Sequence, residues 1–257
     1  MYTNKILILS FLTIFLLHNL PSSAQPVSAN KKVALVSFSV NKDIDCSEVK
    51  GLFGLITDIK KIRQDSLFDL QPTLNKFHKT FYSSYMSKFP FELLPEESVL
   101  QNPEYISFES PNRENRHMSE NKFWWTFLTP PGYKRIYEGG AFKKKNRNEI
   151  KLLRMFDEAD GIMFVDMSYS FTNDSGINLV KFYRVKATVN IVLLNKEGKK
   201  VLRITEYGMS SQKISFYSGI ALEPLQLLPL CQSASDKVLK DLNRKLPRLV
   251  KKVNKKL

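Results

Sequence analysis

The stretch GIMFVDMSYSFTNDSGINLVKFYRVKATVNIVLLNKEGKKVLRITEYGMS, residues 161–210, decides the fold of this chain. It opens with an apolar run over 161–171 that is typical of an interior strand. Apolar and polar residues then alternate over 183–193, as in a strand with one face in water, and a third strand is expected over 201–210. Turn residues at 173–176 and 195–198 separate the segments. Three strands joined by short turns predict an antiparallel meander.

The residues before this stretch predict helices and two further strands. The run VALVSFSV at 33–40 is apolar on both faces and predicts a buried strand. Apolar residues recur with helical spacing over 49–59 and, more regularly, over 67–85, and a short strand is expected at 91–94. A helix over 150–156 leads into the meander. This order predicts one α/β (α+β) domain, in which helices flank a mixed sheet.

The periodicity fails over residues 96–148, and we interpret this segment as an insertion with one or two short helices, one of them around 123–128. It holds both tryptophans, and residues 113–147 carry a net charge of +6. Exposed aromatic rings beside cations suit a partner-binding patch, a glycan platform or an interfacial anchor, whereas the alternative is that the rings pack against the sheet. The candidate partner-binding residues are Phe123, Trp124, Trp125, Lys143, Lys144, Lys145 and Arg147.

The end of the chain, over about 233–257, combines an apolar helical stripe with a net charge of +8 over 237–257. Pro247 is expected to break or kink this helix. The helix would lie in a membrane interface or dock its apolar face on the core while its cations face water; the sequence favours docking. The candidate anion-binding residues are Arg244, Lys245, Arg248, Lys251, Lys252, Lys255 and Lys256.

These two basic segments carry the whole charge excess of the chain, whose net charge is +14. The remaining segments are close to neutral. Localised charge of one sign attracts polyanions such as anionic lipid headgroups, lipopolysaccharide, acidic glycans or released nucleic acid, although no specific nucleic-acid partner is expected. The alternative is a solvated surface that keeps the protein soluble.

The N-terminus has the plan of a secretory signal peptide, with Lys5, an apolar run over 6–17 and a polar stretch after it. Cleavage fits after Ala24 or Ala29, and we favour Ala24, so the expected units are a signal peptide at 1–24 and a domain at 25–257. The first cysteine, Cys46, comes too late for lipid anchoring, and no segment has the length of a membrane span. We therefore expect a periplasmic or secreted protein.

The two cysteines, Cys46 and Cys231, would meet an oxidising compartment. They would form a disulfide or remain two unpaired thiols, and both possibilities stay open because a sequence fixes neither their distance nor their orientation.

The sequence contains no motif of known chemistry. The sequence has no G-x-S-x-G elbow, P-loop or G-x-G-x-x-G, and neither a cofactor nor a metal is expected. His78 is interpreted as a partly buried helix residue, and nothing near His117 completes a ligand set. Asp166 interrupts an apolar strand; if 173–176 closes a simple hairpin, it faces Tyr183 and lies diagonal to Lys181, which would neutralise it.

The chain resembles uncharacterised exported proteins of the Bacteroidota type. The resemblance lies in KKVALVSFSVNKDI, FPFELLPEESVL, ADGIMFVDMSYSF, NKEGKKV and the lysine-rich end. In fold, the first strand and the late meander are similar to the periplasmic α/β domains of curli-secretion and penicillin-binding-protein-activator lipoproteins. The resemblance implies an exported α/β domain and brings no activity and no functional residue.

Three hypotheses follow. The first is a non-enzymatic exported protein, a macromolecular-interaction or envelope-assembly module whose insertion contacts another protein or a polyanionic envelope component. The second is a binder of anionic surfaces, namely lipopolysaccharide, anionic lipid or acidic glycan, through its basic segments. The third and least favoured is an enzyme with a site built from Asp43, Asp45 and Asp166.

Overall fold

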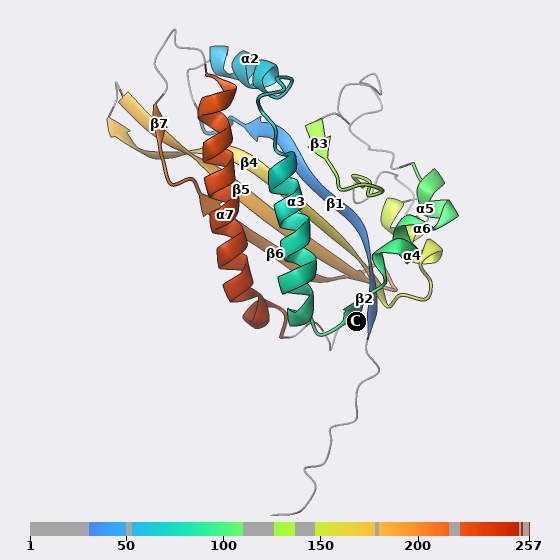
Figure 1. Cartoon of the computed structure of the whole chain (residues 1–257). Coiled ribbons are helices and arrows are strands. Elements are labelled where there is room, and N and C mark those ends of the chain that lie inside the picture. Colours follow the sequence, from blue (N-terminus) through green and yellow to red (C-terminus); the bar gives the residue numbers. More distant parts are fainter. Residues whose placement is uncertain are drawn as a thin grey trace, which may run out of the picture. The chain divides into compact units, whose positions relative to one another are not determined.

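A mixed sheet forms the centre of the protein in the computed structural model, which describes residues 31–49, 53–109, 126–136, 147–177, 180–215, 222–251, 253 and 257. Within these residues the main strand order is β2-β1-β4-β5-β6, while β3 pairs with β1 and β7 with β5 (Figure 1). The strands are β1 (Lys32–Asp45), β2 (Glu92–Leu93), β3 (Phe127–Leu128), β4 (Gly161–Ile177), β5 (Val180–Asn195), β6 (Lys200–Met209) and β7 (Ile214–Ser215).

The sheet confirms the predicted mixed α/β architecture. β1 runs parallel to β4, whereas β4, β5 and β6 form the expected antiparallel meander. β5 buries one side of its alternating pattern, including Val185, Val189 and Ile191, because that side faces a helical layer. The residues from Lys31 to Leu257 form one compact unit.

Helices cover the sheet on both faces. The larger core lies under α2 (Phe53–Ile62), α3 (Gln71–Thr80) and α7 (Pro224–Leu249), and in Figure 1 α3 and α7 lie side by side in front of the strands. On the other face a smaller core lies under α4 (Glu96–Leu100), α5 (Pro103–Ser107) and α6 (Asn148–Met155). α3 continues into a π-helical turn (Phe81–Tyr85) and a 3-10 turn (Met86–Lys88), so the helix predicted over 67–85 is confirmed in its main part.

The C-terminal helix begins nine residues earlier than predicted, at Pro224 rather than 233. Its start is fixed by a capping box, in which Glu223 and Gln226 bond each other's backbone, with Pro224 in the first turn. Pro247 lies within the helix and does not end it, because the helix continues to Leu249. The apolar stripe is buried against β5 and β6, as docking requires; its buried members within the helix are Val238, Leu239, Leu242 and Leu246.

The hairpin between β4 and β5 corrects the prediction for Asp166. Strand β4 continues through the expected turn to Ile177, with a bulge between Asn173 and Ser175. The register therefore shifts, and Asp166 stands opposite Asn190 instead of Tyr183. Residues 173–175 lie in an exposed part of this long strand, where Asp174 pairs with Arg184 and Lys213. Polar residues of this kind are typical of turns, and this is why turn chemistry alone placed the hairpin too early.

The insertion is structured where it is described. It contains α4, α5 and β3, and β3 pairs with β1 at Val40 and Asn41. The helix expected around 123–128 is wrong for Phe127 and Leu128, which form a strand; residues 123–125 lie outside the described residues. The predicted signal peptide and its cleavage sites also lie outside them. Among the helices described, none has the length and apolar character that a membrane crossing requires.

Candidate functional site

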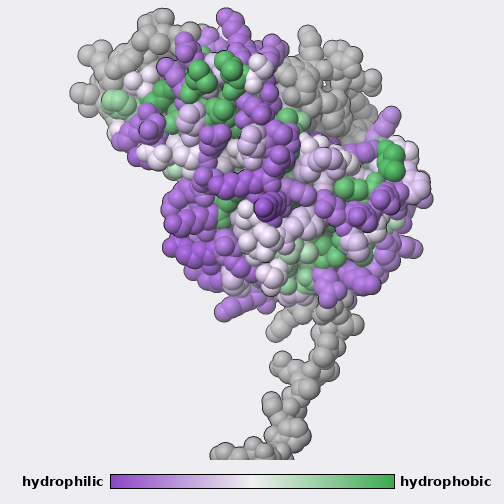
Figure 2. Space-filling model, in the orientation of Figure 1, coloured by the Kyte–Doolittle hydropathy of each residue, from purple (hydrophilic) through white to green (hydrophobic). Residues whose placement is uncertain are grey.

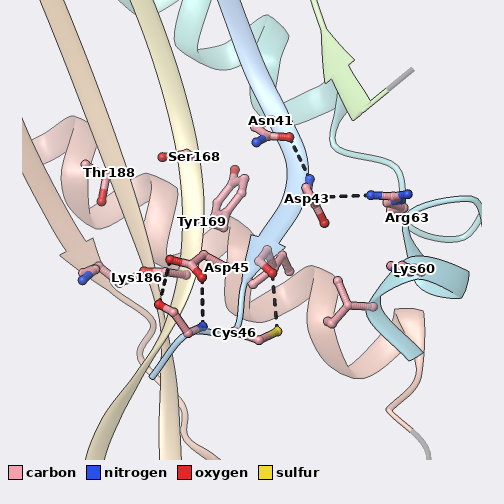
Figure 3. A pocket seen from close by; sticks show the side chains of 14 residues that line it. Asn41, Asp43, Asp45, Cys46, Lys60, Arg63, Ser168, Tyr169, Lys186 and Thr188 are labelled. Carbon is pink, nitrogen blue, oxygen red and sulfur yellow. Dashed lines mark hydrogen bonds and ion pairs between the residues drawn. The ribbon is translucent and has the colours of Figure 1, made fainter. Parts of the chain in front are cut away.

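A cleft of about 640 Å³ opens at the carboxyl end of β1, beside β4 (Figure 3). Val40 pairs with Met167 and Ile44 with Tyr169, so residues 41–43 of β1 stand opposite Ser168 alone. The extra residues form an irregularity in β1, at which a strand bends. Ligand sites of α/β sheets often lie at this position. The lining residues are Asn41, Asp43, Ile44, Asp45, Cys46, Ser47, Ile59, Lys60, Arg63, Ser168, Tyr169, Ser170, Lys186 and Thr188.

The cleft is lined by two carboxylates and three cations, and most of these groups have a partner in it or beside it. The Asp43 carboxylate forms an ion pair with the guanidinium of Arg63 (Figure 3), and the two groups are 3.2 Å apart. The Asp45 carboxylate accepts hydrogen bonds from the backbone N–H and the hydroxyl of Ser47, at 2.9 and 3.0 Å. Lys186 lies 3.8 Å from Glu48. Because positively and negatively charged side chains lie next to each other here, the cleft has no strong electrostatic field of one sign.

Both cysteines are free thiols in the structure, Cys46 in the cleft and Cys231 on the buried side of α7. The Cys46 thiol donates to the carbonyl of Ile44 at 3.4 Å. Partial burial, together with the nearby carboxylates of Asp45 and Asp43, raises the pKa of Cys46 to about 11. Full burial raises the pKa of Cys231 as well. Both groups are therefore protonated and weakly nucleophilic at neutral pH.

Asp166 does not line the cleft, so the structure brings two of the three suspected carboxylates together and leaves the third apart. Its carboxylate accepts a hydrogen bond of 3.1 Å from Asn190 and lies 3.7 Å from Arg135. Asn190 in turn accepts from the Thr205 hydroxyl at 2.9 Å. This row across β4, β5 and β6 gives Asp166 the partners that a half-buried charge requires.

The outer side of α7 carries a row of exposed cations, which we call the α7 stripe. Its members are spaced by three or four residues, so they lie on one face of the helix. The first four span about 16 Å of helix axis and the fifth follows directly after the helix. Figure 2 shows hydrophilic side chains gathered along the lower part of α7. The stripe consists of Lys237, Lys240, Arg244, Arg248 and Lys251.

One carboxylate lies within the stripe. Asp241 is 3.1 Å from Lys237 and 3.3 Å from Arg244, and the hydrogen bond from Lys237 lowers the pKa of Asp241. In the part of the chain that the structure describes, no ion pair engages Lys240, Arg248 or Lys251. The stripe therefore has a clear excess of positive charge, in contrast to the cleft at β1.

A second cleft, of about 470 Å³, lies at the start of the stripe. It forms where the bend after β6 meets the middle of α7, and two stripe residues enter it. The lining residues are Arg184, Met209, Ser210, Ser211, Ser233, Asp236, Lys237 and Lys240.

The predicted anion-binding residues divide into three groups. Arg244, Arg248 and Lys251 are exposed on the stripe, whereas Lys245 is engaged by Glu206 at 2.6 Å and is not available. Lys252, Lys255 and Lys256 lie outside the described residues. The sequence reasoning missed Lys237 and Lys240 as site residues, although stepping back by three or four from Arg244 would have found them.

Most of the predicted partner-binding residues lie outside the part of the chain that the structure describes. Phe123, Trp124, Trp125, Lys143, Lys144 and Lys145 lie outside the described residues. Arg147 is exposed, 3.9 Å from Glu149. His78 is half-buried, as expected, and its Nε2 atom lies 2.9 Å from the carboxylate of Glu96. His117 lies outside the described residues. Among the residues described, no three His, Cys, Asp or Glu side chains are grouped as a metal site requires.

Comparison with known proteins found no matching family model and no matching curated sequence. Among solved structures, the chain is similar to a neuraminyllactose-binding hemagglutinin homolog from Helicobacter pylori. The TM-score is 0.33 at 8% sequence identity, and the match covers 91% of this chain and 93% of that chain. A likeness at this level says nothing of what this protein binds.

Proposed function

We propose that this protein is a non-enzymatic exported protein that binds anionic lipid surfaces of the cell envelope through the α7 stripe. The observation that carries the proposal is the row of exposed cations on a helix whose opposite side is buried. Export rests on the signal-like N-terminal sequence. The cleft at β1 is the larger hollow, but its matched charges favour no ligand of one sign.

The contact would be electrostatic rather than insertive. Val238, Leu242 and Leu246 are buried, so the apolar stripe of α7 beside these cations is packed on the core and does not face the acyl chains. A cation close to an anionic membrane contributes about 1 kcal/mol, which is roughly a fivefold change in affinity. Three cations removed from the stripe should therefore weaken binding by about 100-fold.

The test compares two triple variants on vesicles of phosphatidylglycerol and phosphatidylcholine. The stripe variant combines Arg244→Gln, Arg248→Gln and Lys251→Gln. The control combines Lys79→Gln, Lys151→Gln and Arg154→Gln, which removes the same charge from exposed positions on α3 and α6. We expect a loss of about 100-fold for the first variant and a much smaller loss for the second, measured by co-sedimentation.

Equal losses in both variants would show that net charge acts without a defined surface, and this would contradict the proposal. An unchanged affinity of the stripe variant would contradict it as well. Neutral phosphatidylcholine vesicles should bind neither the native protein nor the variants.

A second candidate function is a protein contact through the aromatic and basic insertion. The observation in its favour is that residues 126–136 of this insertion pack on the sheet. β3 pairs with β1, and the Arg135 guanidinium lies 5.0 Å from the centre of the Phe127 ring. Crosslinking of the Trp124→Ala and Trp125→Ala double variant should then lose partners that the stripe variant retains; identical partner sets would overturn this candidate.

A further inference from the structure

The second cleft, at the start of the α7 stripe, has walls that are fixed by hydrogen bonds. The Arg184 guanidinium donates to the carbonyls of Ser210 and Ser211, at 2.7 and 3.4 Å. The Ser210 hydroxyl accepts from the backbone N–H of Val185 at 3.1 Å. The backbone N–H of Ser211 donates to the Ser233 hydroxyl on α7 at 3.3 Å. The bend after β6 is thus tied to both β5 and α7, so the cleft exists before any ligand arrives.

The carboxylates near this cleft are already neutralised. Asp236 lies 2.7 Å from Lys76 of α3. Asp174 is held by two cations, because Arg184 bonds it at 2.7 Å and Lys213, just before β7, also contacts it. These cations lower the pKa of Asp174, mainly through the hydrogen bond from Lys213. Because these carboxylates are paired with cations, they do not cancel the positive charge of the lysines that line the cleft.

The cations that line the cleft favour one kind of ligand. Lys240 lines the cleft, and no ion pair engages it within the described part of the chain. Lys237 lines the cleft beside it and shares Asp241 with Arg244. Ser211 and Met209 also line the cleft, the first a residue with a hydroxyl and the second an apolar one. Two ammonium groups, a hydroxyl and one apolar wall suit a phosphate ester better than a bare ion, because an ester brings carbon atoms beside its oxygens.

We infer that this cleft binds the phosphate of an anionic lipid headgroup, with Lys240 and Lys237 on the phosphate oxygens and Met209 beside the glycerol carbons. This inference rests on the proposed function and adds a specific subsite to it. The stripe would lie on the surrounding headgroups, while one lipid would enter the cleft at the start of the stripe. Basic pockets next to membrane-binding cations recognise headgroups in this way.

The test uses dihexanoyl phosphatidic acid, a lipid short enough to stay dissolved, with the full-length mature protein in calorimetry. Lys240→Gln is compared with Arg244→Gln, which removes the same charge from the next turn of the stripe but does not line the cleft. We expect Lys240→Gln to weaken binding of the soluble lipid about 10-fold and Arg244→Gln by less than about twofold. Both variants should lose vesicle affinity to a similar extent, about fivefold each.

Equal effects of the two variants on the soluble lipid would overturn the inference and leave the proposed function intact. If neither variant weakened binding to vesicles or to the soluble lipid, both the inference and the proposed function would be overturned. Inorganic phosphate forms the third arm: we expect it to bind at least 10-fold more weakly than the soluble lipid, since it lacks the glycerol carbons. Equal affinity for inorganic phosphate would overturn the assignment to a lipid. Far-UV circular dichroism checks that each variant is folded.

Discussion

Replacing Gly208 with alanine tests how α7 is seated on the sheet. Gly208 lies on β6 directly beneath the helix, and a Cβ atom added there would be 2.7 Å from the carbonyl oxygen of Ala234 and would contact the backbone nitrogen of Val238. Both obstacles are helix backbone, which cannot swing aside as a side-chain end can. The helix must therefore shift away from β6.

The cost of that shift follows from what α7 buries. An ordinary contact needs more than 3.4 Å, so the helix has to move by roughly 0.5 to 1 Å, a gap at which buried atoms lose a quarter to a half of their contact energy. Val238, Leu242 and Leu246 lie in the affected layer. Overpacking of this kind costs about 1 to 3 kcal/mol, and we expect about 3 here because backbone is involved. The melting temperature should fall by roughly 6 to 12 °C.

Thermal unfolding followed by circular dichroism measures the effect, and Gly198→Ala is the matched control. Gly198 sits in the turn between β5 and β6 at φ 71°, where alanine costs about 1 to 2 kcal/mol of backbone strain. Its added Cβ would meet the ends of the Ile150 and Leu153 side chains, at 2.9 and 3.6 Å, and such side-chain ends can move. If Gly208→Ala were no more destabilising than this control, α7 would not rest on β6 as described.

Three further predictions concern the core, the thiols and the stripe. Leu242→Ala should cost about 2 to 5 kcal/mol in urea unfolding, since Leu242 is fully buried. Cys46 and Cys231 should both react with a thiol reagent after unfolding without reductant, and slowly when folded at pH 7, because burial raises the pKa of each. A disulfide-linked chain would contradict the structure. Since Lys237 lowers the pKa of Asp241, this pair stabilises the fold above about pH 4 and is lost only as the pH falls further; Asp241→Asn should raise vesicle affinity about fivefold.

Local patterns in the sequence predict most of the elements and less of their pairing. The alternation over 183–193 identifies β5 and its buried side, because period two is a property of a single strand. The register of β4 on β5 depends on the position of the turn, and the polar residues 173–176 suggested one too early. The parallel pairing of β1 with β4 joins segments more than a hundred residues apart, so no local pattern contains it.

The candidate sites were less predictable because they depend on tertiary neighbours. Lys245 and Arg244 are adjacent and chemically similar in the sequence, yet Lys245 bonds Glu206 of β6 whereas Arg244 faces water. The cleft at the start of the stripe combines Arg184, Ser211 and Lys240, which come from three separate elements. Only the packing of α7 across the ends of β5 and β6 brings them together.

The docking of α7 also determines which physical interaction can drive binding. A free amphipathic helix would gain most of its membrane affinity from apolar burial, which salt does not screen. Once Leu242 and Leu246 are committed to the core, only the cations remain, and their attraction to headgroups decays over a Debye length of about 10 Å at 0.1 M salt and about 3 Å at 1 M. Vesicle binding should therefore disappear between these two salt concentrations while the circular dichroism spectrum stays unchanged. Binding that survives 1 M salt would mean that α7 leaves the sheet and inserts, and both the seating of the helix and the role of the stripe would then be wrong.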